Sequence, residues 1–425
     1  MRSLPLSTQG NSRLISFFTF RSGVLCLLGF AALNAWMIWQ AHDPIRQGYV
    51  DFASFYTAGR IVQSGQSPRL YDPALQWKVQ QEFASTVKIR RGPLPYVRPP
   101  FEALVFLPLA YLPYPTACVV WMALKTVLLL AIPFLLPRED HKGEEISAHA
   151  WEGLLCLAFF PSASDLLLGQ DSILLLLILV CALRLLLRGA EVQCGVVLGL
   201  GLFKFHFIIP VVAIFLLRKK SSLVMGFLAT ASLLFVVSLM LVDWAGILAY
   251  PRYLWGLNQS SELGMVKPQS MPNLRGLVTA LLGNGPLPAV AQWSLGGMVV
   301  IGVIVASRCW RGDDRRSVAA SFCFSIVVML ATSYYAYSYD LTLLLLPLLL
   351  FGRTFFAGAE IAGWPRTLFI AATAVLLCTP FSWILALRGG QFRWMGLVVL
   401  ALAVSLSGWM KSYQVVLANS DSQVY

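Results

Sequence analysis

The stretch "SGVLCLLGFAALNAWMIWQ", Ser22–Gln40, decides the fold, because it is a long apolar run without a charged side chain. About twenty apolar residues are enough for a helix to cross the hydrocarbon core of a bilayer. The run ends in bulky residues without a small-residue cleavage site, which predicts an uncleaved first span rather than a signal peptide. The segment 1–21 before it is basic and predicts a cytoplasmic tail.

The rest of the chain repeats this pattern. Hydrophobic residues make up 58% of the sequence and charged residues only 12%, about half the usual share in a soluble protein. No long polar segment remains to fold separately, so we predict an all-α polytopic membrane protein with one transmembrane domain over 22–410. The runs that predict its spans are 22–40, 114–137, 149–166, 170–188, 193–204, 206–217, 221–242, 288–307, 316–333, 337–352, 367–385 and 391–410.

Two short runs, 193–204 and 206–217, decide the topology. They could form one span interrupted by "KFH", but that would place the basic "RKK" of Arg218–Lys220 on the outer side. Because Lys and Arg collect in short cytoplasmic connections, we favour two helices that meet near the outer surface at Lys204 to His206. This gives about twelve spans.

With that topology both tails, 1–21 and 411–425, are cytoplasmic, and the long outer loops are 41–113 and 243–287. The first outer loop contains "RPPFEALVFLPLAYLP", Arg98–Pro113, which is too short to cross and is closed by prolines. It predicts membrane-lying helices. The net charge of +12 then belongs largely to cytoplasmic connections, and no nucleic-acid partner is predicted.

Five polar stretches fall on the outer side. They are "GYVDFASFYTAGR" with Asp51, "GQDS" with Gln170 and Asp171, the Lys204–His206 junction, "LNQSSELGMVKPQSMPNLRGL" at 257–277, and "TSYYAYSYD" at 332–340. Ionisable groups at membrane depth are costly and usually mark a site or a pathway. Five such stretches on one face predict a cavity open to the outer side.

Each stretch also has a purely structural interpretation. The acids could cap helices, the lysine could reach the interface, the histidine could be a packing residue, and the tyrosines could form an aromatic belt. The residues concerned are Asp51, Asp171, Asp340, Lys204, His206 and the tyrosines between 334 and 339. Their coincidence on one face favours a functional site.

The cysteines and histidines do not predict a metal site. The four His are scattered, and the eight Cys lie mostly in apolar runs without a C-x-x-C pair. A D-x-D pair of carboxylates, which could hold a divalent metal, is also absent from the sequence. We therefore expect no cofactor, while a dependence on a metal ion stays open.

An ordered set of stretches resembles a known family. It consists of "DFASFYTAGRIVQSGQSPRLYDP", "YVRPPFEALVFLPLAYLPY", "LLLGQDSILLLLILV", "GLGLFKFHFIIPVVAIFLLRKK", "MPNLRGL" and "TSYYAYSYDLTLLLLP". Together, over about 48–352, these resemble glycosyltransferase family 87, whose members are similar to polyprenyl-phosphate-mannose-dependent α-mannosyltransferases of the GT-C membrane fold.

The resemblance implies a catalytic carboxylate in the first outer loop, where Asp51 matches, together with membrane-lying helices and an outward cavity. It also implies a bacterial inner-membrane enzyme of the cell envelope. Some members carry a S-W-x-H-H-like stretch before a late span, whereas this chain has "YAYSYDL". A second catalytic or acceptor-binding histidine therefore does not carry over.

The residues can support such a transfer of mannose, or another hexose or pentose, to a lipid or glycan acceptor. One carboxylate can deprotonate the attacking hydroxyl, and a phosphate leaving group needs no general acid, so Asp51 alone is sufficient. Charge that builds on the phosphate needs cations. The candidates are Lys204, then Arg275, Arg98 and His206 for the phosphate, and Gln170, Asp171, Tyr337, Asp340 and Tyr56 for the sugar or acceptor, with Trp255 as a further stacking residue.

Two other classes of function compete with a transferase. A transporter or flippase of lipid-linked sugars predicts inverted repeats and ionisable groups near the midplane of several spans. We find no such repeat, and the ionisable groups gather at one face, which favours an enzyme at a boundary. A membrane scaffold would not need Asp51.

Overall fold

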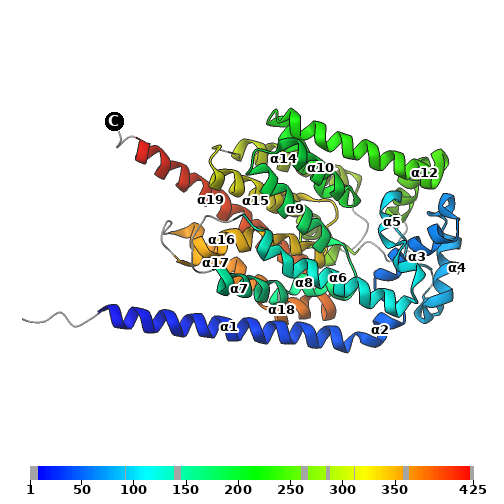
Figure 1. Cartoon of the computed structure of the whole chain (residues 1–425), viewed down its shortest axis with the longest axis horizontal. Helices are drawn as coiled ribbons and strands as arrows, with labels where there is room; N and C mark the ends of the chain where they lie inside the picture. The colour runs from blue at the N-terminus through cyan, green and yellow to red at the C-terminus, as the bar shows by residue number, and fades with distance from the viewer. Residues whose placement is uncertain are drawn as a thin grey trace, which may run out of the picture.

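The computed structural model describes residues 8–90, 92–137, 145–259, 267–283, 288–310, 312–357 and 363–421. These residues form helices and connections, without a strand in any of the described ranges. The prediction of an all-α polytopic membrane protein is confirmed. The first-loop residues gather at one end of the molecule, opposite the start of α1 (Thr8–Gln40) and the end of α19 (Met395–Asp421) (Figure 1).

The count of twelve spans is not confirmed. Seven helical stretches of the described chain are long and apolar enough to cross a membrane, or up to nine if each bent pair is one span. The long ones include α1, α6 (Tyr114–Leu135), α12 (Ser221–Gln259), α14 (Ala289–Cys309), α15 (Arg315–Thr332) and α19. The bent pairs are α7 (Glu145–Ala158) with α8 (Phe160–Leu168) at 63°, and α17 (Trp364–Leu377) with α18 (Thr379–Trp383) and its continuation to Arg388 at 61°.

The stretch 191–217 is apolar and long enough for one crossing, but it folds back on itself. It consists of α10 (Glu191–Leu200), η5 (Gly201–Lys204) and α11 (Phe205–Leu217). Lys220 Nζ, just after α11, lies 2.9 Å from Glu191 Oε1 at the start of α10. The two ends therefore meet, and the chain turns at Lys204, as the two-helix alternative predicts.

The hairpin packs tightly against α12. Thr230 Oγ1 donates a hydrogen bond of 3.2 Å to Val196 O, and a Cβ on Gly195 would lie 1.9 Å from Leu223 O. Only glycine allows this approach of two helix backbones.

Replacing Gly195 with Val should therefore lower the free energy of unfolding by about 1–3 kcal/mol, because the new side chain would force the helices apart. Denaturation in detergent measures the change. The matched control is Gly296→Val on α14, where a Cβ added to the glycine would meet no other atom within 4 Å. An equal loss in both variants would contradict the close-packing interpretation.

The described residues of 41–113 fold as a layer of short helices over the end of the bundle, which we call the first-loop layer (Figure 1). These are α2 (His42–Arg46), α3 (Phe52–Gln63), η1 (Ser67–Arg69), α4 (Pro73–Phe83), η2 (Ser85–Lys88), η3 (Pro100–Glu102), α5 (Ala103–Phe106) and η4 (Leu109–Tyr111). Phe52, Phe55, Tyr96 and Phe106 are almost fully buried within the layer, where Trp121 of α6 joins their cluster. The expected membrane-lying segment 98–113 is broken into three short turns, because prolines interrupt its backbone hydrogen bonds.

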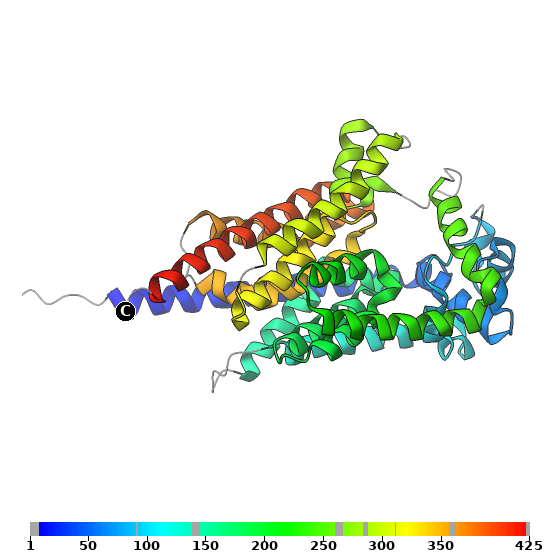
Figure 2. The same cartoon turned by 90° about the horizontal axis from the view of Figure 1, so that it is seen from above.

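The long helix α12 runs toward this layer (Figure 2). It is two helices joined at Asp243, where φ is 56° and the Asp243 carboxylate accepts a hydrogen bond from Gly246 N. The apolar run thus ends at residue 242. The described part of the connection 243–287 contains the rest of α12, η6 (Pro268–Ser270) and α13 (Leu274–Leu282).

Three shorter apolar helical segments bring charged residues to one place. They are α9 (Ser172–Leu186), α11, and η7 (Ser338–Leu344) with α16 (Leu345–Ala357). A helix of 15 residues such as α9 is about 22 Å long, shorter than the hydrocarbon core of about 30 Å. The polar residues at the N-terminal ends of these segments, Asp171, Lys204 and Asp340, contact one another.

Candidate active site

A cavity of about 590 Å³ lies between the first-loop layer and the ends of the short helices. Its size is within the range of small-molecule sites. Its apolar walls include Met37 and Ile38 of α1, Phe160 of α8, and Ala386 and Leu387 after α18. Its polar lining includes Asn34, Asp51, Ser54, Arg98, Ser164, Gln170, His206, Lys267, Ser270, Tyr335, Tyr337, Ser338, Tyr339 and Asp340.

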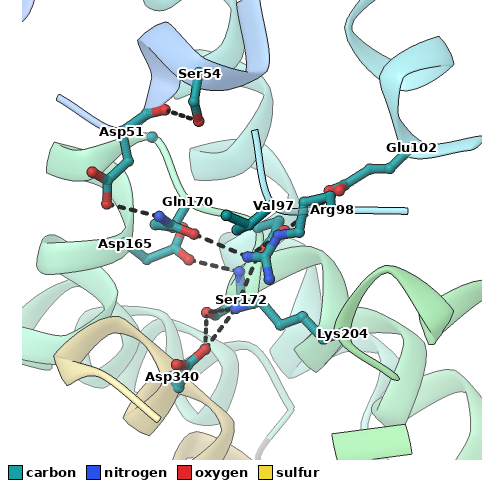
Figure 3. A network of polar contacts seen from close by, with 12 residues as sticks. Asp51, Ser54, Val97, Arg98, Glu102, Asp165, Gln170, Ser172, Lys204 and Asp340 are labelled. Atoms are coloured by element: carbon teal, nitrogen blue, oxygen red, sulfur yellow. Dashed lines mark hydrogen bonds and ion pairs between the residues drawn. The ribbon is translucent and has the colours of Figure 1, made fainter. Parts of the chain in front are cut away.

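Asp51 lines this cavity at the start of α3. Its carboxylate makes no capping hydrogen bond to the helix, and instead Oδ2 accepts a hydrogen bond of 2.8 Å from Gln170 Nε2 (Figure 3). Burial raises the pKa of the Asp51 carboxyl above its ordinary value, and the Gln170 hydrogen bond offsets part of this rise. A raised pKa makes the carboxylate a stronger base near neutral pH.

Behind Asp51 lies a chain of alternating charges. Arg98 donates hydrogen bonds to Gln170 Oε1 at 3.1 Å and to Asp171 Oδ1 at 2.8 Å. Glu102 adds a more distant ion pair, with Oε2 3.8 Å from Arg98 Nε. Burial raises the pKa of the Glu102 carboxyl, and the negative charge of Asp171 raises this pKa further.

Lys204 continues this chain. Its Nζ lies 2.8 Å from Asp171 Oδ1 and 2.6 Å from Asp340 Oδ1, and it donates a hydrogen bond to Ser172 Oγ. The residue is 1% exposed and does not line the cavity. We call Arg98, Asp171, Lys204 and Asp340 the inner cluster. Because two carboxylates enclose Lys204, its charge is already neutralised locally.

Asp340 has contacts on both sides. Oδ1 faces Lys204, and Oδ2 accepts a hydrogen bond of 2.8 Å from Tyr337 N, which fixes the turn before η7. Of the two carboxylates that line the cavity in the described residues, Asp340 is thus paired with a cation, whereas Asp51 has an amide as its contacting side chain.

Several other predicted residues reach the cavity and some do not. His206 and Tyr337 line it. Tyr56 packs in the first-loop layer and donates its hydroxyl to Leu112 O at 2.7 Å, while Trp255 is 64% exposed. Arg275 is buried against the rings of Tyr334 and Tyr335 and donates to Tyr334 O at 3.2 Å; only Tyr335 of these lines the cavity.

Sequence reasoning missed an ion pair between Lys125 of α6 and Asp165 of α8. Lys125 Nζ lies 3.0 Å from Asp165 Oδ1, and both side chains are fully buried. Asp165 Oδ2 also accepts a hydrogen bond of 2.7 Å from Ser172 N, so the pair holds the start of α9. The signal was present, because each charge stands within an apolar run.

Lys267 was also missed. It is exposed and lines the cavity together with Ser270. Both belong to the polar stretch 257–277, from which sequence reasoning did not single out Lys267. Residues 260–266 of that stretch, like 1–7 and 422–425 of the tails, lie outside the described residues. No group of three metal-ligating side chains occurs in the described part of the chain, and the expected absence of a cofactor stays a prediction.

The comparison with protein families supports an enzyme. The model of glycosyltransferase family 87 matches residues 96–333, more than half of the chain. The match includes Arg98, Gln170 and Lys204, but it begins after Asp51 and ends before Asp340. Comparison with curated proteins gives no match, and neither does comparison with solved structures. The chain therefore belongs to glycosyltransferase family 87, and it is a multi-pass membrane glycosyltransferase.

Proposed function

We propose that the protein moves a sugar, mannose or another hexose or pentose, from a polyprenyl-phosphate donor to a hydroxyl of a lipid or glycan acceptor. The observation that carries this proposal is the Asp51 carboxylate, which lines a mostly apolar cavity and is contacted by an amide rather than a cation. The acceptor hydroxyl gives its proton to Asp51 while its oxygen attacks the anomeric carbon. The bond from that carbon to the phosphate oxygen breaks, and its electron pair leaves with the phosphate.

The leaving phosphate requires positive charge as the bond breaks. We assign this role to Lys267 and Arg98, with His206 as a further hydrogen-bond donor to the phosphate, since all three line the cavity. Lys204 and Arg275 lie behind the cavity wall, and we propose that they hold the site together. The polyprenyl chain would lie against Met37, Ile38 and the half-exposed Leu387.

Replacing Lys267 with Met is expected to raise the donor KM by about tenfold, because a charged hydrogen bond to the phosphate is lost. Lys267→Arg should restore most of the affinity. Initial rates at varied donor concentration measure both. A donor KM that stays unchanged in Lys267→Met would remove Lys267 from the phosphate site.

We further propose that the active site faces the outer side of a bacterial plasma membrane and that both tails are cytoplasmic. The basic turn Arg218–Lys220 supports this orientation, because short connections rich in Lys and Arg usually lie on the cytoplasmic side. A reporter fused after Lys220 should then report the cytoplasm, and one inserted in the first-loop layer after Gln66 should report the outside. The reverse pattern would overturn the proposed orientation.

The transfer itself can be tested with the purified full-length chain in proteoliposomes. Radiolabelled undecaprenyl-phosphate mannose, glucose and arabinose serve as donor probes, and a bacterial membrane-lipid extract serves as the source of acceptor. We expect label in a new product together with release of polyprenyl phosphate. Movement of intact donor between leaflets, without a new product, would instead indicate a flippase.

A further inference from the structure

Gln170 contacts the proposed base directly. Its amide nitrogen donates to Asp51 Oδ2 at 2.8 Å, and the side chain is almost completely buried, with 6% of the residue exposed. Asp51 and Gln170 are 119 positions apart in the sequence. Their contact therefore joins the first-loop layer to the junction of α8 and α9.

The orientation of the Gln170 amide is fixed from the other side by Arg98. The guanidinium donates to Gln170 Oε1 at 3.1 Å. In the reversed orientation the amide NH₂ would face the guanidinium, and the amide oxygen would face the Asp51 carboxylate, so both contacts would be repulsive. The donating nitrogen must therefore face Asp51.

The backbone around Gln170 is also held in place. Trp121 Nε1 donates to Gly169 O at 2.9 Å, Gln170 N donates to Asp165 O at 3.0 Å, and Ser172 N donates to Asp165 Oδ2 at 2.7 Å. Arg98 is in turn held by Asp171. Hydrogen bonds therefore hold Gln170 through both its backbone and its side chain, and Figure 3 shows the side-chain contacts.

We propose that Gln170 is a positioning residue, which holds one carboxylate oxygen of Asp51 and thereby turns the other toward the reacting hydroxyl. This inference rests on the proposed function, and it replaces a sugar-binding role for Gln170. The Gln170 amide donates its NH₂ to Asp51 and accepts from Arg98 with its oxygen. Both polar atoms of the side chain are therefore already engaged within the protein and do not need a sugar as partner.

The role has a consequence for the pH profile. A hydrogen bond donated to a carboxylate favours its ionised form, so the loss of Gln170 should raise the pKa of Asp51 further. Other titratable or charged groups near Asp51 also influence its pKa electrostatically, and the variants leave them unchanged. These groups are Arg90 and Arg98 of the first loop, Asp171 before α9, Tyr114 of α6, and Tyr337 and Tyr339 around η7.

The test compares wild type, Gln170→Leu and Gln170→Met, which is close to glutamine in length and adds no charge, with undecaprenyl-phosphate mannose, glucose and arabinose as probes. In both variants we expect kcat to fall, the donor KM to change less than twofold, and the acid limb of the kcat profile to move up by about one pH unit. The control is Gln66→Leu, which replaces a partly buried glutamine beyond the end of α3 and should leave the pH profile in place.

Infrared titration of the Asp51 carboxylate, as a difference from Asp51→Asn, measures the same shift without turnover. Thermal unfolding identifies a variant that fails to fold, in which case the better-matched Gln170→Met decides. A higher KM with an unmoved acid limb and an unmoved infrared midpoint would overturn the positioning role alone. If the wild type transfers sugar from none of the donors, the proposed function and this inference both fail.

Discussion

Replacing Asp51 with Asn is expected to lower the rate of sugar transfer by about 100- to 10,000-fold, which is the usual contribution of a positioned general base. The amide has the shape of the carboxylate, and its oxygen can still accept the hydrogen bond from Gln170. Only the basicity is lost. Initial rates in proteoliposomes at saturating donor measure the effect as kcat.

The same substitution should not destabilise the protein. The folded state raises the pKa of Asp51, so it favours the protonated form and the ionised carboxylate lowers stability at neutral pH. A neutral isostere removes that penalty, and the melting temperature should be equal to or above that of the wild type. Transfer at the wild-type rate by a well-folded Asp51→Asn would exclude Asp51 as the base.

Replacing Lys204 with Met should reduce the free energy of unfolding by about 3–5 kcal/mol, because it leaves buried carboxylates without their shared cation. Asp171 would keep Arg98, but Asp340 would lose its ion pair at 2.6 Å. The double variant with Asp340→Asn should recover part of the loss, since no unpaired charge then remains at that position. Denaturant titration in detergent micelles measures all three proteins.

The matched control for Lys204 is Lys220→Met. Lys220 pairs with Glu191 at a similar distance, 2.9 Å, but its side chain is 42% exposed. Solvent screening limits such a pair to about 1 kcal/mol or less. Equal losses of unfolding free energy in the two variants would show that burial does not make the ion pairs of Lys204 more stabilising than an exposed pair.

The helices could be predicted from the sequence because each apolar run carries its own signal. All twelve runs coincide with helical segments, and the turn at Lys204 followed from the basic residues after it. The number of crossings could not be predicted, since α9 and α11 are as apolar as full spans and differ from them only in length and packing.

The site was predictable only at the level of its polar stretches. Asp51, Gln170 and Asp340 do line one cavity, yet nothing local in the sequence says that Gln170 contacts Asp51 or that Lys204 is enclosed by two acids. Tyr56 shows the same limit, because α3 is buried on nearly all sides and its pattern does not distinguish cavity from core.

The hairpin that turns at Lys204 has a consequence for the order in which the chain is made. A lysine inside an apolar run is costly in lipid until an acid neutralises it. Asp171 precedes Lys204 and is already synthesised when the hairpin emerges, whereas Asp340 follows 136 residues later. Asp171 can therefore neutralise the charge of Lys204 during synthesis, and Asp340 joins the inner cluster only when the later helices have packed.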